Sequence, residues 1–226
     1  MTNKALFITA TDTGVGKTLV SGLLLEYLLR RSIKAGYQKW VSTGDADNPA
    51  DLAECMKIAG AQPAPNDLDS QVPFRFSYPA SPHFAAEIDG KEVDAGMILR
   101  KFAEMNSRYE FLIVEGVGGL LVPLRRDLLL ADLLTKLELP TVIVARSGLG
   151  TLNHTLLTIE ALRNRKLPIA GVIFTDPAEV DETLALDNIR TIAEIGRVEI
   201  LGRLPYSNHR PDLIRHFSLI GSRMVK

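Results

Sequence analysis

Short apolar runs alternate with longer segments of helical periodicity along almost the whole chain. Several of these runs are rich in valine and isoleucine and lack polar alternation, which is typical of strands covered on both faces in a parallel sheet. The pattern predicts six such strands, at residues 5–10, 35–41, 111–115, 141–145, 169–174 and 199–204.

Helical patterns fill most of the intervals between these runs. In them apolar residues recur every three to four positions, as they do on one face of a helix. The predicted helices are residues 17–31, 51–60, 95–107, 129–136, 152–164 and 181–195. A repeated strand and helix order predicts an α/β fold, a doubly wound and mostly parallel sheet with helices on both faces, which binds ligands at the carboxyl ends of its strands.

The segment from residue 60 to residue 82 breaks this rhythm and holds several of the 12 prolines. We expect an irregular connection within one sheet here rather than a linker between domains. With 226 residues and 46% hydrophobic content, the chain is expected to form a single domain over residues 1–226.

Charge and apolar content exclude several classes of partner. Lysine and arginine number 26 against 27 acidic residues, so the basic excess of nucleic-acid-binding proteins is missing. The start of the chain lacks a secretory signal, and no run reaches the roughly 18 apolar residues of a membrane span. We therefore expect a cytoplasmic protein with neither nucleic acid nor membrane as partner. The single cysteine, Cys55, excludes internal disulfides, and we expect it to be buried and inert.

The strongest chemical signal lies between the first predicted strand and the first predicted helix. Glycines and a helix N-terminus at such a place present backbone N–H groups to an anion, and a lysine adds charge. Gly16 permits close backbone approach, Lys17 reaches the outer phosphates, and the Thr18 hydroxyl can ligate Mg²⁺. Thr11 occupies the position where the usual spacing has its first glycine. The segment predicts a phosphate-binding loop: Ala10-Thr11-Asp12-Thr13-Gly14-Val15-Gly16-Lys17-Thr18.

Charged residues end two of the other predicted strands. Lys39 lies where it can meet an anion and stabilise charge that develops during phosphoryl or carboxyl transfer, although a strand-end lysine that reaches solvent is the alternative. Glu115 ends a buried apolar run and is followed by glycines, an arrangement that nucleotide hydrolases use for the acidic partner of Mg²⁺. A tight turn alone would explain the glycines but not Glu115.

A third cluster follows the fourth predicted strand. Gly148 and Gly150 precede Thr151 and a helical pattern, so this second helix N-terminus can receive a carboxylate. Asn153 and His154 fit either a binding role or an ordinary polar position in the first turn.

A further helix start is predicted near residue 81. Ser81 suits the N-cap and Pro82 the first helical position. A binding role for the next residue, His83, is the less favoured interpretation.

Taken together, these motifs resemble dethiobiotin synthetase. The matching segments occur in the family's order and span most of the chain, from residue 5 to about residue 206. Any one of them is shared by many ATPases, but the set is specific. They are Thr11-Asp12-Thr13-x-Val15-Gly16-Lys17-Thr18; Lys39 with Val41 and Thr43-Gly44; Ser81-Pro82-His83; Val114-Glu115-Gly116-x-Gly118-Gly119; and Gly148-Leu149-Gly150-Thr151-x-Asn153-His154.

The resemblance implies a homodimeric ligase of biotin synthesis that closes the ureido ring of dethiobiotin from 7,8-diaminononanoate, CO₂ and ATP with Mg²⁺. In the family, one amine captures CO₂ as a carbamate, the carbamate attacks the γ-phosphate, and the second amine closes the ring on the mixed anhydride and expels phosphate. Lys17 and Lys39 would be catalytic, because they neutralise two anions that otherwise repel one another. Thr18, Asp51 and Glu115 would hold Mg²⁺.

The resemblance also implies the binding residues. Thr13, Thr43 and Gly118 would contact the diamine or its carbamate. Its distant carboxylate would bind, across a dimer interface, to the backbone of Gly150, Thr151, Leu152 and Asn153. The residues implied for ATP are Thr13, Gly14, Val15, Gly16, Lys17, Thr18, Asp51, Glu115, Gly116, Val117 and Gly118, with Thr175, Asp176, Leu204, Pro205 and Tyr206 near the nucleobase.

The chain departs from the family's usual pattern at three positions. Ala10 and Trp40 stand where the family has glycine and proline, and Trp40 lies beside Lys39. Thr175 stands where the family has asparagine. A hydroxyl cannot offer the paired donor and acceptor of an amide, which weakens adenine selection by that route.

Two other classes share parts of the pattern. A partitioning-type ATPase of the ParA and MinD kind is a switch that dimerises on ATP, and it carries a signature lysine early in its phosphate loop, where this chain has Asp12. An ATP-dependent amidotransferase of cobalamin synthesis shares the loop and the Glu-Gly turn. It also carries a glutaminase domain with a nucleophilic cysteine, whereas only 20 residues follow Tyr206 here.

Overall fold

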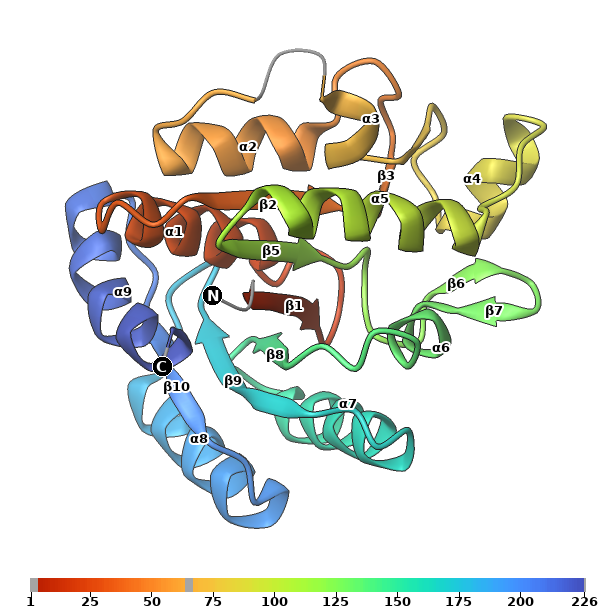
Figure 1. The fold of residues 1–226 in the computed structure, drawn as a ribbon. Helices are drawn as coiled ribbons and strands as arrows, with labels where there is room; N and C mark the ends of the chain where they lie inside the picture. The colour runs from red at the N-terminus through yellow and green to blue at the C-terminus, as the bar shows by residue number, and fades with distance from the viewer. Residues whose placement is uncertain (1–3, 64–66, 226) are drawn as a thin grey trace.

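Six parallel strands form the central sheet of the computed structural model, which describes residues 4–63 and 67–225 (Figure 1). Their order across the sheet is β10-β9-β8-β1-β5-β2, and every pairing in it is parallel. The strands are β1 (Lys4–Ala10), β2 (Ala35–Lys39), β5 (Phe111–Glu115), β8 (Thr141–Ala145), β9 (Ile169–Thr175) and β10 (Ile200–Leu204).

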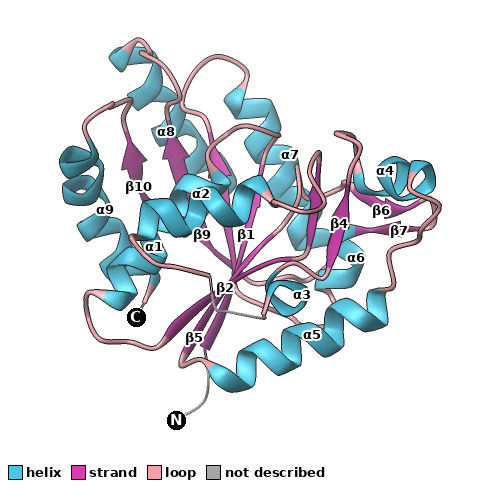
Figure 2. Cartoon of the chain, turned by 90° about the horizontal axis from the view of Figure 1, so that it is seen from above, coloured by secondary structure: helices cyan, strands magenta, loops and turns pink. Residues whose placement is uncertain are grey.

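Helices cover both faces of this sheet, as Figures 1 and 2 show. One face packs against α1 (Lys17–Leu29), α2 (Ala50–Ala59) and α9 (Arg210–Met224). The other packs against α5 (Ala95–Arg108), α6 (Leu130–Leu134), α7 (Thr151–Asn164) and α8 (Glu182–Gly196). The doubly wound α/β prediction is therefore confirmed.

The two cores follow from the alternation of side chains along each strand. In β1, Leu6 and Ile8 belong to the core under α1, whereas Phe7 between them belongs to the core on the opposite face. Because both faces are buried, the strands of this sheet are mostly apolar, and their runs in the sequence lack polar alternation.

The second predicted strand is wrong at its end. The sheet strand β2 stops at Lys39, and Val41 belongs to the separate strand β3 (Val41–Thr43), which pairs with β4 (Phe74–Phe76). Trp40 lies between the two strands, fully buried, with its ring 4.8 Å from that of Phe7. The chain leaves the central sheet at this tryptophan, and the apolar residues Trp40 and Val41, which follow Lys39 directly, hide the break.

The proline-rich segment is more ordered than predicted. It contains α3 (Leu68–Gln71) and β4, while residues 64–66 within it lie outside the described part of the chain. Pro82 begins α4 (Pro82–Ile88), with Ser81 at the N-cap position, which confirms that predicted helix start. An antiparallel pair, β6 (Pro123–Arg125) and β7 (Leu128–Leu129), was not predicted.

Two further expectations can be compared with the structure. Cys55 is fully buried in α2, as predicted. Over the described residues, no helix is both long enough and apolar enough to cross a membrane.

Candidate active site

The candidate site lies where β1, β5 and β2 end side by side. The phosphate loop connects the end of β1 to α1, while Glu115 and Lys39 are the last residues of their strands. Lys39 and Glu115 are partners in the parallel register, and Glu115 is paired in turn with Ile8 of β1. The topology therefore brings together residues that are far apart in the sequence, at the edge where such sheets bind ligands.

The phosphate loop depends on its glycines. Gly14 and Gly16 have φ angles of 69° and 99°, a region that side chains with a Cβ rarely adopt. A Cβ on Gly16 would also lie 2.9 Å from the Thr175 hydroxyl oxygen. This conformation starts α1 at Lys17, so that the backbone N–H groups of its first turn face the loop.

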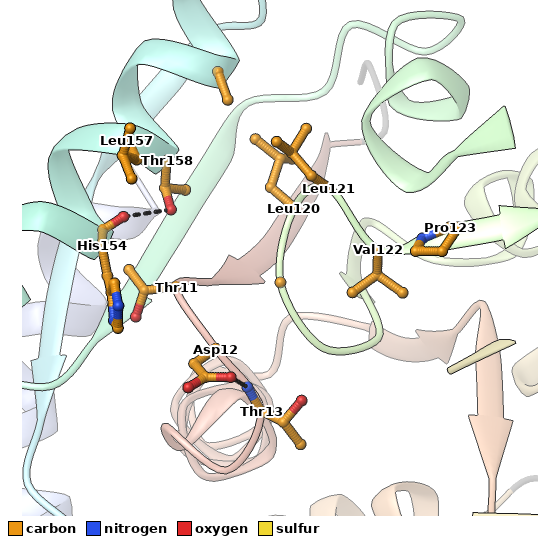
Figure 3. A pocket seen from close by; sticks show the side chains of 12 residues that line it. Thr11, Asp12, Thr13, Leu120, Leu121, Val122, Pro123, His154, Leu157 and Thr158 are labelled. Atoms are coloured by element: carbon orange, nitrogen blue, oxygen red, sulfur yellow. Dashed lines mark hydrogen bonds between the residues drawn. The ribbon is translucent and has the colours of Figure 1, made fainter. Parts of the chain in front are cut away.

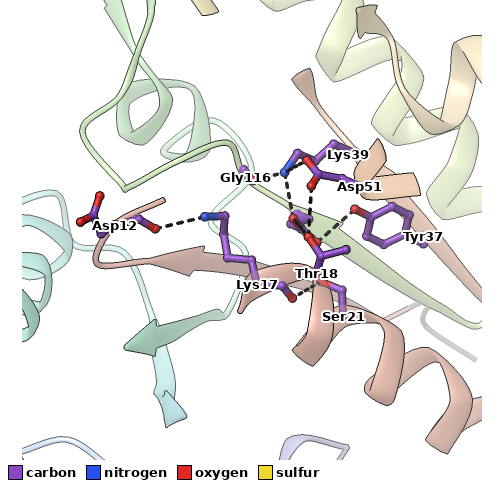
Figure 4. Close-up of polar contacts among 9 residues, drawn as sticks. Asp12, Lys17, Thr18, Ser21, Tyr37, Lys39, Asp51 and Gly116 are labelled. Carbon is purple, nitrogen blue, oxygen red and sulfur yellow. Dashed lines mark hydrogen bonds and ion pairs between the residues drawn. The ribbon is translucent and has the colours of Figure 1, made fainter. Parts of the chain in front are cut away.

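Lys17 is buried beside the loop, and its ammonium donates to the Asp12 carbonyl oxygen at 3.3 Å (Figure 4). Burial disfavours its charge, and repulsion from Lys39 adds to this effect, so the pKa of Lys17 falls to about 8. A phosphate group would restore the missing countercharge.

Lys39 uses all three of its ammonium protons. Its Nζ lies 2.7 Å from Asp51 Oδ2, 2.8 Å from Glu115 Oε1 and 2.9 Å from the Gly116 carbonyl oxygen (Figure 4). Burial alone would lower its pKa, but attraction to Glu115 and Asp51 outweighs burial and raises it. Lys39 is therefore a charged group at the floor of the site, not a solvent-exposed lysine at a strand end.

Thr18, Asp51 and Glu115 converge as oxygen ligands. The Thr18 hydroxyl lies 3.2 Å from Asp51 Oδ1 and 3.0 Å from Glu115 Oε1. Burial would raise the pKa of Asp51, but Lys39 and the Thr18 hydroxyl bring it below its ordinary value, so the carboxylate is ionised. Two carboxylates and a hydroxyl beside a phosphate loop are hard donors of the kind that Mg²⁺ takes together with phosphate oxygens and water. These residues fit that metal.

These groups line a cavity of about 430 Å³. Thr13, Thr43 and Gly118 line the same cavity, so the residues implied for substrate and those implied for phosphate share one space. Its full lining is Thr13, Gly14, Gly16, Lys17, Thr18, Leu19, Lys39, Thr43, Asp51, Glu54, Glu115, Val117 and Gly118.

The sequence analysis missed three polar residues of this site. Ser21 and Tyr37 donate to Glu115, and Glu54 lines the cavity one helical turn beyond Asp51. Burial and repulsion from Asp51 raise the pKa of Glu54. The only signal in the sequence was the spacing of these residues from Lys17, Asp51 and Lys39. Positions three or four apart in a helix share a face, and so do positions two apart in a strand.

A second cavity of about 400 Å³ lies on the other side of Thr13 (Figure 3). Figure 3 shows Thr11, Asp12 and Thr13 at one end, with α7 side chains on one side and the loop after Gly119 on the other. Most of its lining is apolar: Leu120, Leu121, Val122, Pro123, Leu157 and Ala161. His154 and Thr158 add polar groups from α7.

The predicted carboxylate-binding turn borders the second cavity, which His154 lines, but its own residues line neither cavity. Gly150, at φ 90°, and the three residues after it begin α7, but they are not among the residues that line either cavity within one chain. The Thr151 hydroxyl is paired with that of Thr155 at 3.0 Å. His83 also lies elsewhere, beside a surface cleft with Glu87 and Arg126.

The residues predicted for the nucleobase are held by other contacts. The Thr175 hydroxyl donates to the Val15 carbonyl oxygen in the phosphate loop. The Asp176 carboxylate accepts from the Ser147 hydroxyl at 2.6 Å and from Arg203 Nε at 2.7 Å. The Asp176 N–H donates to the Leu204 carbonyl at 3.0 Å, which brings the ends of β9 and β10 together. Pro205 and Tyr206 follow β10 at this edge, and Tyr206 is exposed.

Comparisons with known proteins find relatives over most of the chain. A family model described as "AAA domain" matches residues 4–210. The ATP-dependent dethiobiotin synthetases BioD of Methanococcus vannielii and Methanocaldococcus jannaschii are 37% and 38% identical, over 87% of this chain and 91% and 92% of those proteins. The enzyme of the same name from Anaeromyxobacter dehalogenans is 38% identical over 97% of this chain and 96% of that protein.

Solved structures share the fold at much lower identity. The MinC:MinD cell division protein complex of Aquifex aeolicus matches with a TM-score of 0.60 and 12% identity, over 97% of this chain and 94% of that one. A ParA family ATPase from Chlorobium tepidum matches with a TM-score of 0.54 and 14% identity, over 97% of this chain and 92% of that one. This likeness concerns the fold alone.

Proposed function

Because the chain belongs to the dethiobiotin synthetase family of ATP-dependent ligases, we propose that the cavity around Lys17, Lys39 and Glu115 is where it joins 7,8-diaminononanoate and CO₂ at the expense of ATP. The products are dethiobiotin, ADP and phosphate. The observation that carries this proposal is the convergence of a phosphate loop, two buried lysines and a set of oxygen ligands on one cavity.

The phosphate chain of ATP lies on the loop and the first turn of α1 in this proposal. Lys17 binds the outer phosphates, and Thr18, Asp51 and Glu115 hold Mg²⁺. When bound, the metal offsets the charge of the transferred phosphate and its leaving group.

The chemistry follows from the charges in the cavity. One substrate amine adds to CO₂, forms the new C–N bond and loses a proton, which leaves a carbamate. A carbamate oxygen then attacks the γ-phosphorus, and the bond from that phosphorus to ADP breaks. Lys17 and Lys39 reduce the repulsion between these two anions and hold them close. The second amine attacks the carbamate carbon, expels phosphate, loses a proton and closes the ring.

The two cavities suit the two ends of the substrate. Thr13 lines both cavities, so a ligand with its amines beside Lys39 could extend past Thr13 into the apolar cavity of Leu120 and Leu157. By analogy with the family, its carboxylate would bind to the backbone at Gly150–Asn153 of a second subunit; within one chain this turn is not part of the lining of either cavity. We therefore propose a homodimer with the site at its interface.

Base recognition has the least support from side chains in this proposal. The base would lie near Asp176 and the turn at Leu204–Tyr206, while the Thr175 hydroxyl proton is already donated to the Val15 carbonyl oxygen. We expect CTP and GTP to replace ATP with a smaller loss of activity than in an enzyme with asparagine at position 175. Turnover with each of the three nucleotides measures this.

The partitioning ATPases are the second candidate, because MinD and ParA proteins share the fold. Their identity to this chain is low, and Asp12 occupies the place of their signature lysine. The 38% identity to dethiobiotin synthetases over most of the chain favours the ligase.

A single assay tests the proposal. Purified protein with 7,8-diaminononanoate, bicarbonate, ATP and Mg²⁺ should release dethiobiotin and ADP. The Lys17→Ala and Lys39→Ala variants should lose this activity, whereas Lys57→Ala, on the exposed side of α2, should retain it. Folded protein that forms no dethiobiotin, and whose ATP hydrolysis rises with DNA or lipid, would support the partitioning class instead.

A further inference from the structure

We propose that Ser21 and Tyr37 are positioning residues that hold one carboxylate oxygen of Glu115, so that the other oxygen alone serves the reaction site. The role of Glu115 in this inference rests on the proposed function. The hydrogen bonds that hold Glu115 do not depend on that function. Neither residue appears in the motifs that identify the family in this sequence.

The two carboxylate oxygens of Glu115 have different partners. Oε2 accepts from the Ser21 hydroxyl at 2.7 Å and from the Tyr37 hydroxyl at 3.0 Å. Oε1 accepts from Lys39 at 2.8 Å and lies 3.0 Å from the Thr18 hydroxyl. Glu115, Ser21 and Tyr37 are all fully buried, so water does not compete for these bonds.

The two donors come from two different elements that pack beside Glu115, α1 and β2. Ser21 lies one turn after Lys17 in α1, and Tyr37 lies two residues before Lys39 in β2, so both are fixed by the elements that carry the proposed catalytic lysines. Figure 4 shows both hydroxyls pointing at the cluster that contains Lys39 and Thr18. The carboxylate is therefore held between the phosphate loop helix and the Lys39 strand.

Ser21 has only one proton to give. Its oxygen lies 2.7 Å from Glu115 Oε2 and 2.9 Å from the Lys17 carbonyl oxygen, and neither acceptor can donate in return. The charged acceptor is the closer one and makes the stronger bond. The main effect of removing the hydroxyl should therefore fall on Glu115, while the helix retains its backbone bonds.

Fixing Oε2 determines the direction of Oε1. A carboxylate held on one side only would turn about its last torsion, and its second oxygen would compete for Lys39 and Thr18. Loss of such outer hydrogen bonds weakens metal binding or activity by about 10 to 100-fold in metalloenzymes. We expect the same range here, with little effect on how the diamine binds.

The test uses Tyr37→Phe, Ser21→Ala and the double variant in the full-length chain. Mn²⁺ affinity is measured in the presence of a non-hydrolysable ATP analogue, together with kcat, KM for the diamine and metal-free ADP affinity. Each single change should weaken Mn²⁺ binding and lower kcat by about tenfold, leave KM and ADP affinity unchanged, and combine non-additively in the double variant because both bonds reach one oxygen.

Tyr27→Phe is the matched control. Tyr27 is a buried tyrosine of α1 whose ring packs beside Phe217 and under Arg31, so phenylalanine preserves its described ring contacts. It should behave as the wild type in every measurement.

The outcomes separate the two claims. Wild-type Mn²⁺ affinity and kcat in both single variants would overturn the positioning role, as would a lower melting temperature with unchanged Mn²⁺ affinity. If the wild type binds Mn²⁺ with nucleotide and the variants bind it more weakly, yet no dethiobiotin forms, the positioning role stands and the proposed function fails.

Discussion

Lys17, which we propose binds phosphate, is buried at a cost to stability. Its pKa of about 8 in the folded chain lies below the ordinary value of 10.5, so the folded state binds fewer protons than the unfolded state between these two pH values. The free energy of unfolding contributed by this group therefore rises as the pH increases from 8 to 10.5. Below pH 8 the buried charge destabilises the fold by up to about 3 kcal/mol.

A Lys17→Met variant should therefore be more stable than the wild type at pH 7, by about 1–3 kcal/mol. The difference should shrink as the pH approaches 10. Urea unfolding of both proteins at pH 7 and pH 10 measures this, with Lys57→Met as a control for loss of a surface lysine. A stability difference that does not change with pH would contradict the assignment of the effect to the Lys17 charge.

At the scale of single residues, the sequence predicts Lys39 and Glu115 but not the two hydroxyls that hold Glu115. Lys39 and Glu115 could be placed because each is a charge at the end of an apolar run, where parallel strands meet. Ser21 and Tyr37 could not, because serine in a helix and tyrosine in a strand are ordinary residues until Glu115 is seen beside them. Their roles depend on a contact between distant segments.

The packing of α1 on α2 depends on Gly22. A Cβ at this position would lie 2.7 Å from the Ile58 Cβ and 3.1 Å from the Cys55 carbonyl oxygen. In a free helix, alanine in place of glycine stabilises by up to about 1 kcal/mol. Overpacking here should cost about 1–3 kcal/mol and reverse that gain.

Gly22→Ala should therefore lower stability and also kcat, because α2 carries Asp51 in its first turn. Gly96→Ala in α5 is the matched control, since its Cβ would meet mainly the flexible side chains of Asp94 and Arg100. Thermal unfolding and steady-state kinetics of both variants provide the comparison. Wild-type stability and kcat in Gly22→Ala would show that the packing of α1 on α2 tolerates the added methyl group.

The C-terminal helix α9 is tied to the site helices by Arg210. Its guanidinium donates to the Ile58 carbonyl oxygen of α2 at 2.9 Å and pairs with the buried Glu26 of α1 at 3.1 Å. Arg210→Met should lower the free energy of unfolding by about 1 kcal/mol and speed amide exchange in α9. Arg215→Met, which removes only an exposed pair with Asp212, should change neither quantity by much.

At the scale of elements, the strands of the central sheet were predictable and the connections were not. A strand buried on both faces is mostly apolar, as β5 is up to Glu115 and β8 is after Thr141, and the predicted bounds of these two are confirmed. The break at Trp40 has no glycine or proline to mark it, because the apolar residues Trp40 and Val41 follow Lys39 directly. In α9 only Phe217 and a few other residues are buried, so the apolar periodicity that would predict this helix from the sequence is weak.

At the scale of the whole molecule, two exposed leucines line the second cavity. Leu157 and Leu121 line that cavity and are 56% and 49% exposed, and Leu149, just before Gly150, is 93% exposed. Apolar side chains grouped in this way are typical of a surface that another chain covers. Their position supports the proposed dimer, in which the turn at Gly150–Asn153 of one subunit completes the site of the other.

Mixing two inactive variants tests that arrangement directly. Lys39→Ala removes the proposed catalytic lysine, and Asn153→Asp puts a negative charge where the substrate carboxylate would bind, at a helix N-terminus that tolerates an acidic residue. If each site takes Lys39 from one subunit and Asn153 from the other, a mixed dimer contains one site with both defects and one intact site. Refolding the variants together in equal amounts should recover about a quarter of wild-type activity, since half of the dimers are mixed and each has one working site. If both residues served the same subunit's site, every site in the mixture would carry one defect, and activity would not exceed that of the separate variants.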